Sequence, residues 1–116
     1  MKRGEIWWAE LGERRPLEQT GRRPVVVWQS DSLSRVLHSI LVVPLTTNME
    51  RARLAGTAVV LSTELGPPAD SVALAFQMRA VPKSALLVRI RLLSEAELVE
   101  LELATDEAIG RLELEL

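Results

Sequence analysis

The chain has 116 residues, 47% of them hydrophobic, which is enough for one domain (1–116) with its own buried core. It has no cysteine and a single histidine, His38, which excludes disulfides, thiolate metal sites, a cysteine nucleophile and any zinc site of several histidines. The net charge is −2, but residues 94–116 carry −7 and residues 1–93 carry +5. This asymmetry fits an anionic partner, or simply a solvated acidic helix on a neutral domain.

Short β-branched and apolar segments, bounded by Gly, Pro, Asn, Asp and Ser, predict strands. In chain order these strands are predicted at residues 6–11, 24–28, 39–45, 57–61, 71–76 and 87–93. The connections are predicted as loops at 12–21 and 46–48, a turn or short helix at 30–34, and a turn at 66–70. Residues 77–81 are expected to continue extended until Pro82 breaks the strand.

The last predicted strand alternates Val88, Ile90 and Leu92 with Arg89 and Arg91, a pattern typical of a half-buried strand. From residue 94 onward, the spacing of the apolar residues changes from every second residue to the period of a helix.

Ser94 and Glu97 have the spacing of a capping box, which predicts a helix beginning there and ending near Gly110. Its expected apolar stripe is Leu98, Leu101, Thr105, Ala108, Ile109 and Leu112. Short strands followed by one helix predict an α+β fold, a small, mostly antiparallel sheet or half-open barrel with the C-terminal helix packed on it.

Polar residues gather where the predicted strands begin or end, positions that hold side chains on rigid supports at the rim of a sheet. They are Glu18, Gln19, Arg22, Arg23, Thr46, Thr47, Asn48, Gln77 and Arg79. No phosphate-binding loop, HExxH or GxSxG motif accompanies them.

Two of these residues have a specific argument. Pro24 restricts the backbone of Arg23, so its guanidinium is aimed and suits a phosphate, although an ion pair with Glu18 would also explain it. Thr46 offers a hydroxyl donor just past Pro44, although ordinary turn chemistry would use it as well.

Five segments, in this order along the chain, resemble the MazF/PemK (Kid) family of toxins of type II toxin–antitoxin systems. They are KRGEIWW at 2–8, EQTGRRPVVV at 18–27, VVPLTTN at 42–48, DSV at 70–72 and QMR at 77–79, followed by Leu93-Ser94 before the helix. The resemblance spans essentially the whole chain. It implies the small SH3-like α+β fold shared with the CcdB gyrase toxin.

The resemblance also implies an activity. Family members are homodimers that cut single-stranded RNA, including mRNA, at short sequences without a metal or cofactor, leaving a 2′,3′-cyclic phosphate and a 5′-hydroxyl. A MazE-like antitoxin silences them with an acidic tail. With no visible signal peptide and no apolar stretch long enough to span a bilayer, the chain is expected in the cytoplasm.

By position, Arg23 and Thr46 correspond to the family's essential arginine and threonine, and we take them as catalytic. The substrate-binding residues expected from the same comparison are Glu18, Gln19, Arg22, Thr47, Asn48, Gln77 and Arg79. The chain departs from many members at Phe76, where they have an acid, and at 80–83, which reads AVPK rather than TIDK. These changes bear on base preference and rate, not on the reaction class.

The expected chemistry uses the ribose 2′-OH as the nucleophile, so the protein needs no nucleophile of its own. Arg23 and Thr46 would stabilise charge on the phosphoryl oxygens, and Arg23 could also protonate the leaving oxygen. An arginine is a poor base at neutral pH, so Glu18 is the better candidate for the general base, with His38 as a third option. The base is left unassigned.

Three other functions are compatible with the residues. A gyrase poison on the CcdB-like fold would not need Arg23 and Thr46, and their joint presence favours the ribonuclease. A member that only binds RNA or antitoxin would keep the residues without the activity. An unrelated small barrel acting as an interaction module would match only some of the five segments.

Overall fold

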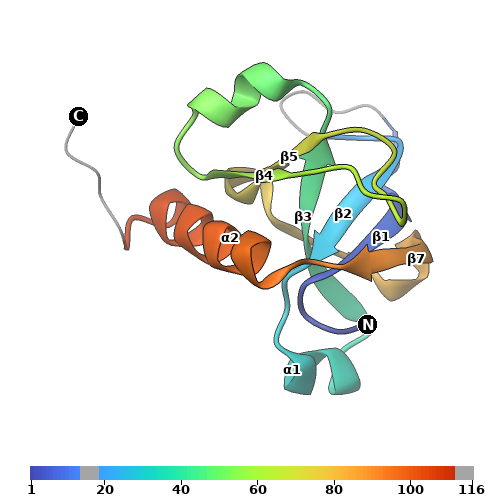
Figure 1. The fold of residues 1–116 in the computed structure, drawn as a ribbon. Coiled ribbons are helices and arrows are strands. Elements are labelled where there is room, and N and C mark those ends of the chain that lie inside the picture. Colours follow the sequence, from blue (N-terminus) through green and yellow to red (C-terminus); the bar gives the residue numbers. More distant parts are fainter. Residues whose placement is uncertain (14–18, 112–116) are drawn as a thin grey trace.

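The computed structural model describes residues 1–13 and 19–111. Its strands are β1 (Glu5–Glu10), β2 (Arg22–Val27), β3 (Ser39–Thr46), β4 (Thr57–Val60), β5 (Ser71–Leu74), β6 (Arg79–Pro82) and β7 (Leu86–Leu92). All pair antiparallel in one sheet of order β4-β5-β3-β2-β1-β7, and β6 pairs with β3 beside this path (Figure 1). The expected α+β fold is confirmed, with the sheet left open.

The helices are α1 (Asp31–Val36) and α2 (Glu95–Ala108), with short 3₁₀ turns η1 (Met49–Arg53), η2 (Ala75–Gln77) and η3 (Lys83–Ala85). The strand predicted at 71–76 was too long, because its last two residues lie in η2. That turn redirects the chain, so β6 pairs with β3 instead of continuing β5. No helix in the described part of the chain is long and apolar enough to cross a membrane.

Apolar residues on both faces of the central strands build two cores. In β2, Val26 faces the helix-side core, whose members include Leu101 and Ala104 of α2, while Val25 and Val27 face a far-side core. β3 divides in the same way, with Val43 and Leu45 on the helix side and Ile40 and Val42 on the far side. Successive residues of a strand point to opposite faces, so a run of consecutive valines fills both cores.

The capping box that starts α2 is confirmed: Ser94 Oγ accepts from the Glu97 N–H at 3.2 Å, and Glu97 Oε1 accepts from the Ser94 N–H at 2.9 Å. The helix ends at Ala108, and Gly110 follows at φ +79°, which a glycine adopts without strain. Because the helix stops there, Ile109 is 58% exposed and not part of the apolar stripe. Leu112 lies outside the described residues.

The alternation predicted for β7 was wrong. Val88 and Leu92 are exposed, whereas Arg91 is buried, with 7% of its surface accessible. The pairing of β7 with β1 is irregular between Ile6 and Trp7 and again between Trp8 and Ala9. Each irregularity places two β7 residues against one step of β1, a β-bulge that breaks the period of two.

Arg91 is buried because it forms an ion pair with Glu97 of α2 at 2.7 Å. Burial alone raises the pKa of Glu97, but the bonds and charge of Arg91 and the Ser94 N–H together lower it below its ordinary value. A carboxyl with a lowered pKa contributes stability above its unfolded pKa, and this contribution is lost as the pH falls through the folded pKa.

We therefore expect the urea midpoint of the wild-type protein to fall more steeply below about pH 4.5 than that of Glu97→Gln, which cannot titrate. Urea unfolding at a series of pH values between neutral and acidic tests this. Parallel curves for the two proteins would show that Glu97 does not contribute to the acid sensitivity.

Candidate active site

The two residues predicted to be catalytic lie at the same edge of the sheet. Arg23 is the second residue of β2 and Thr46 is the last residue of β3. These strands are antiparallel neighbours, with Val25 opposite Pro44, so the start of one lies beside the end of the other. Both residues line a cleft of about 370 Å³, here called the β2–β3 cleft.

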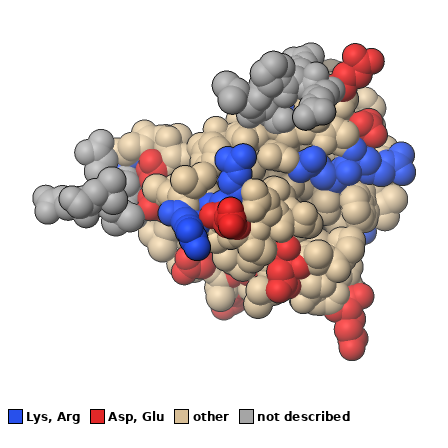
Figure 2. Space-filling view, turned by 90° about the horizontal axis from the view of Figure 1, so that it is seen from above, with Lys and Arg blue, Asp and Glu red and all other residues tan. Residues whose placement is uncertain are grey.

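The walls of the β2–β3 cleft come from four strands and three connections. They are Trp8, Gln19, Arg22, Arg23, Pro24, Leu45, Thr46, Thr47, Pro68, Ala69 and Ser71. Figure 2 looks onto the molecule from above the view of Figure 1 and shows Lys and Arg side chains with Asp and Glu side chains among them. Of the described residues that line the cleft, Arg22 and Arg23 are charged and the others are neutral. The cleft is therefore suited to a ligand with both negative charge and neutral parts.

The Arg23 guanidinium is held by three acceptors. Its Nε donates to the Thr20 carbonyl at 2.9 Å, and its Nη1 donates to the Leu45 carbonyl at 3.3 Å and to Gln19 Oε1. All three acceptors are neutral oxygens, so these bonds orient the guanidinium without neutralising its charge. The sequence predicts that Pro24 aims this side chain, whereas in the structure its hydrogen bonds to these three acceptors orient it.

The electrostatic environment of the Arg23 guanidinium favours the binding of an anion. Burial lowers the pKa of the Arg23 guanidinium, and the positive charge of Arg79 lowers the pKa further. An arginine remains charged at neutral pH despite such shifts, so the two neighbouring positive charges are unfavourable in the free protein. A phosphate bound in the cleft would offset this repulsion.

Thr46, the last residue of β3, also lines the cleft. Its Oγ1 accepts a hydrogen bond from the Asn48 N–H at 3.2 Å, the turn contact considered from the sequence. That bond occupies a lone pair, so the hydroxyl proton can still be donated to a ligand. Thr47 also lines the cleft, whereas the Asn48 side chain accepts from the Glu50 N–H at 3.2 Å and caps η1.

Gln77 and Arg79 lie outside the cleft walls and support the first connection instead. The Gln19 N–H donates to Gln77 Oε1 at 2.9 Å, and Arg79 Nη2 donates to the Leu11 carbonyl at 3.2 Å. They therefore hold the two sides of the β1–β2 connection. Gln77 also positions Gln19, the residue that contacts Arg23.

Of three further candidates, the structure describes two, Arg22 and His38. Arg22 lines the cleft but is exposed and forms a long ion pair with Glu10 at 4.0 Å, a contact worth little energy. His38 precedes β3 and lies about 25 Å of extended chain from Thr46, so it is not part of this site. Glu18 lies outside the described residues.

The sequence did not reveal one wall of the cleft, formed by Trp8, Pro68, Ala69 and Ser71. The turn that contains Pro68 was expected, but its location was not. β5 pairs with the end of β3, placing Val72 opposite Thr46, and this brings the turn to the cleft. Long-range pairing of this kind leaves no local signal in the residues.

A small open sheet, the helix α2 packed on it and a cleft with two arginines at the ends of two central strands define a small α+β domain with a candidate site for an anion. The model of the PemK-like, MazF-like toxins of type II toxin–antitoxin systems matches residues 2–109. The chain belongs to this family.

Individual relatives agree along nearly the full chain. The endoribonuclease MazF of Staphylococcus epidermidis is 28% identical over 110 residues, covering 95% of this chain and 92% of that protein. MazF from Deinococcus radiodurans (Form-I) has the same fold, with a TM-score of 0.79, 21% identity and coverage of 95% and 96%. A mycobacterial endoribonuclease, solved in complex with its cognate antitoxin, gives a TM-score of 0.78, 19% identity and coverage of 98% and 99%. These comparisons do not favour the gyrase-poison alternative.

Proposed function

We propose that this chain is an endoribonuclease toxin that cuts single-stranded RNA, including mRNA, and that it does so without a metal. The observation that carries the proposal is that the oriented guanidinium of Arg23 and the hydroxyl-bearing Thr46 line the same cleft. Membership of the toxin family and a relative named as an endoribonuclease support it.

In the proposed reaction the ribose 2′-oxygen attacks the adjacent phosphorus, and the bond from phosphorus to the 5′-oxygen breaks. The products are a 2′,3′-cyclic phosphate and a 5′-hydroxyl. Arg23 stabilises the negative charge that grows on the phosphoryl oxygens, and Thr46 donates a hydrogen bond to the same oxygens. The need for a 2′-hydroxyl restricts the substrate to RNA.

One proton must leave the 2′-hydroxyl and one must reach the leaving oxygen. In this proposal Arg23 gives the second. The described residues that line the cleft include no carboxylate and no imidazole. Glu18 adjoins Gln19 in the sequence, as Asp70 adjoins Ala69 and Ser71, so the base stays unassigned and Glu18 is the candidate that we test first.

Glu18→Gln is expected to lower kcat by about 10²-fold, because general-base catalysis contributes at least that much. The measurement is the single-turnover rate of RNA cleavage as a function of pH, where the variant should also lose the dependence on the deprotonated carboxylate. Glu13→Gln, an exposed glutamate on the same connection, is the matched control. Unchanged cleavage by Glu18→Gln would exclude Glu18 as the base.

The activity itself is tested by incubating the purified protein with a long defined RNA in EDTA. We expect discrete cuts whose 5′ fragments end in a cyclic phosphate. The cut positions then give the recognition sequence. Intact RNA after incubation with folded protein would overturn the proposed function.

The proposal includes the assembly and the inhibitor of the family. The chain acts as a homodimer in the cytoplasm, where its mRNA substrate is found. Its cognate antitoxin binds through an acidic segment that competes with RNA for the positive cleft, as charge complementarity favours. The mycobacterial endoribonuclease solved in complex with its cognate antitoxin supports an antitoxin partner for this chain.

A further inference from the structure

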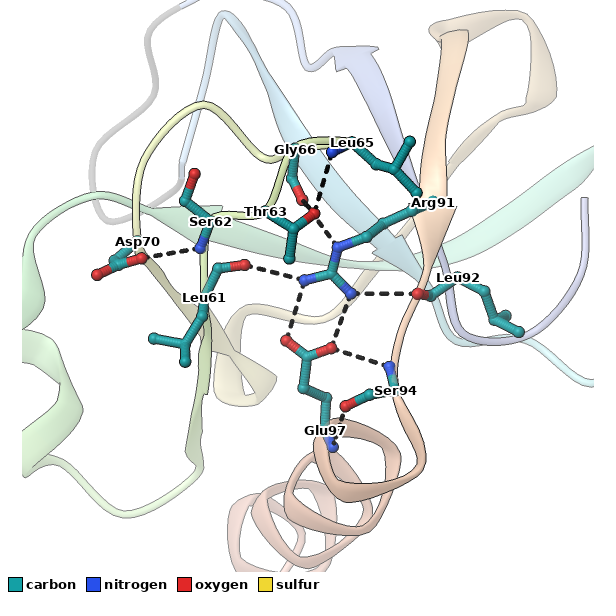
Figure 3. A network of polar contacts seen from close by, with 10 residues as sticks. All are labelled: Leu61, Ser62, Thr63, Leu65, Gly66, Asp70, Arg91, Leu92, Ser94 and Glu97. Carbon is teal, nitrogen blue, oxygen red and sulfur yellow. Dashed lines mark hydrogen bonds and ion pairs between the residues drawn. The ribbon is translucent and has the colours of Figure 1, made fainter.

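Arg91 is a buried hub whose five N–H donors are all used (Figure 3). Its Nε donates to the Gly66 carbonyl at 2.8 Å, and its Nη2 donates to the Leu61 carbonyl at 2.9 Å. Its Nη1 donates to the Leu92 carbonyl at 3.1 Å, and the two terminal nitrogens bind the Glu97 carboxylate at 2.7 and 3.1 Å. One side chain thus joins β7, the start of α2 and the connection between β4 and β5.

The segment 61–70, here called the β4–β5 loop, is braced internally as well. The Ser62 N–H donates to Asp70 Oδ1 at 2.8 Å, and the Ser62 hydroxyl donates to the Pro67 carbonyl at 2.8 Å. Gly66 has φ +113°, and a Cβ there would lie 2.6 Å from Ile90 Cγ2, so the loop backbone rests directly on β7. Movement of one end of the loop is therefore transmitted to the other.

The far end of this loop is the wall of the β2–β3 cleft that faces Thr46. Pro68 and Ala69 line the cleft, followed by Ser71 at the start of β5. None of these three side chains carries a charge, whereas Arg22 and Arg23 are on the opposite side. The charged side suits the phosphate, and the neutral side suits the flat, uncharged face of a nucleobase.

We propose that Arg91 is a positioning residue for RNA specificity, which fixes the β4–β5 loop so that its neutral wall packs against a base beside the cut phosphate. The inference rests on the proposed function. Arg91 touches neither the cleft nor the reacting atoms, and it acts through the Leu61 and Gly66 carbonyls.

Stability alone does not account for this arrangement. A buried ion pair can often be replaced by packed apolar side chains with no loss of stability. What the guanidinium supplies is a rigid plane with five donors that grips two carbonyls of one loop and a carboxylate together. A lysine has the charge but only three donors on one atom, so it cannot hold this geometry.

The test compares Arg91→Lys with Arg89→Lys, a control on the same strand whose arginine binds Glu5 and no residue of the loop. For Arg91→Lys we expect KM for a short RNA to rise about tenfold, the cost of losing a buried hydrogen bond, with kcat within about twofold of wild type. The map of cut sites should relax at one nucleotide position. Arg89→Lys should keep the wild-type KM and cut sites.

A second readout does not depend on activity. Amide hydrogen exchange of residues 61–71 should be faster in Arg91→Lys than in Arg89→Lys. Asp70 is exposed, and Asp70→Ala removes its hydrogen bond with the Ser62 N–H. This variant should also raise KM, relax the cut sites and speed the exchange of residues 61–71. It provides the test if Arg91→Lys does not fold. Wild-type KM, cut sites and exchange in the folded variants would overturn the inference. Absence of cleavage by the wild-type protein would overturn the proposed function instead, and the exchange result would still decide whether Arg91 fixes the wall.

Discussion

Arg23→Ala is expected to cut RNA about 10²- to 10³-fold more slowly than the wild-type protein, the typical cost of losing one aimed donor to a developing anion. The loss should fall on the chemical step, because the guanidinium, held by three neutral acceptors, lines the cleft in which we propose that the reacting phosphate binds. Single-turnover cleavage at saturating protein measures this step. Arg23→Lys keeps the positive charge but lacks the planar guanidinium. Compared with Arg23→Ala, it should restore the affinity for RNA more than the cleavage rate.

The matched control for Arg23→Ala is Arg35→Ala, an exposed arginine of α1 at the other end of β3. It removes the same charge from the molecule and should leave the rate unchanged. Both proteins should melt near the wild-type temperature, because Arg23 is only half-buried and water can replace its bonds. A nearly normal rate for Arg23→Ala would remove this residue from the chemistry.

Thr46→Val is expected to lower kcat by about 10²- to 10³-fold with little change in KM, because the hydroxyl contributes only when charge accumulates on the phosphoryl oxygens. Valine has the same shape and suits the last position of a strand, so the sheet should be undisturbed. Thr46→Ser retains the donor and should recover most of the rate. Steady-state kinetics on one short RNA separates the two parameters.

Thr57→Val provides the control for Thr46→Val. Thr57 begins β4, and its hydroxyl donates to the Leu54 carbonyl at 2.8 Å, away from the cleft. It loses a hydroxyl in the same way and should retain normal kinetics. If Thr46→Val raised KM and left kcat intact, Thr46 would be a substrate-binding residue and not a stabiliser of the transition state.

The parts of this molecule that could be predicted from the sequence are those set by local rules. Runs of valine marked the buried strands, and Ser94 with Glu97 marked the start of the helix because the capping box needs only four consecutive residues. Arg23 and Thr46 were found because each lies near a proline at the end of a predicted strand, although in the structure both residues belong to the strands β2 and β3. Their roles came from the family resemblance and not from spacing.

The parts that could not be predicted depend on pairing between distant segments. The burial of Arg91 follows from bulges in the β1–β7 ladder and from carbonyls on a loop 25 and 30 residues away in sequence. The position of Gln77, which supports Gln19 from outside the cleft, depends on a contact across 58 residues. Alternation within one strand gives no information on either contact.

The strands that carry Arg23 and Thr46 are also the strands that divide the two cores, since neighbouring residues such as Val25 and Val26 are buried on opposite faces. Bending either strand end would require both cores to repack at once, at a cost of several kcal/mol. An inhibitor of this protein therefore has little to gain by distorting the catalytic groups. We expect an inhibitor to act by covering the β2–β3 cleft while the structure of the cleft stays unchanged.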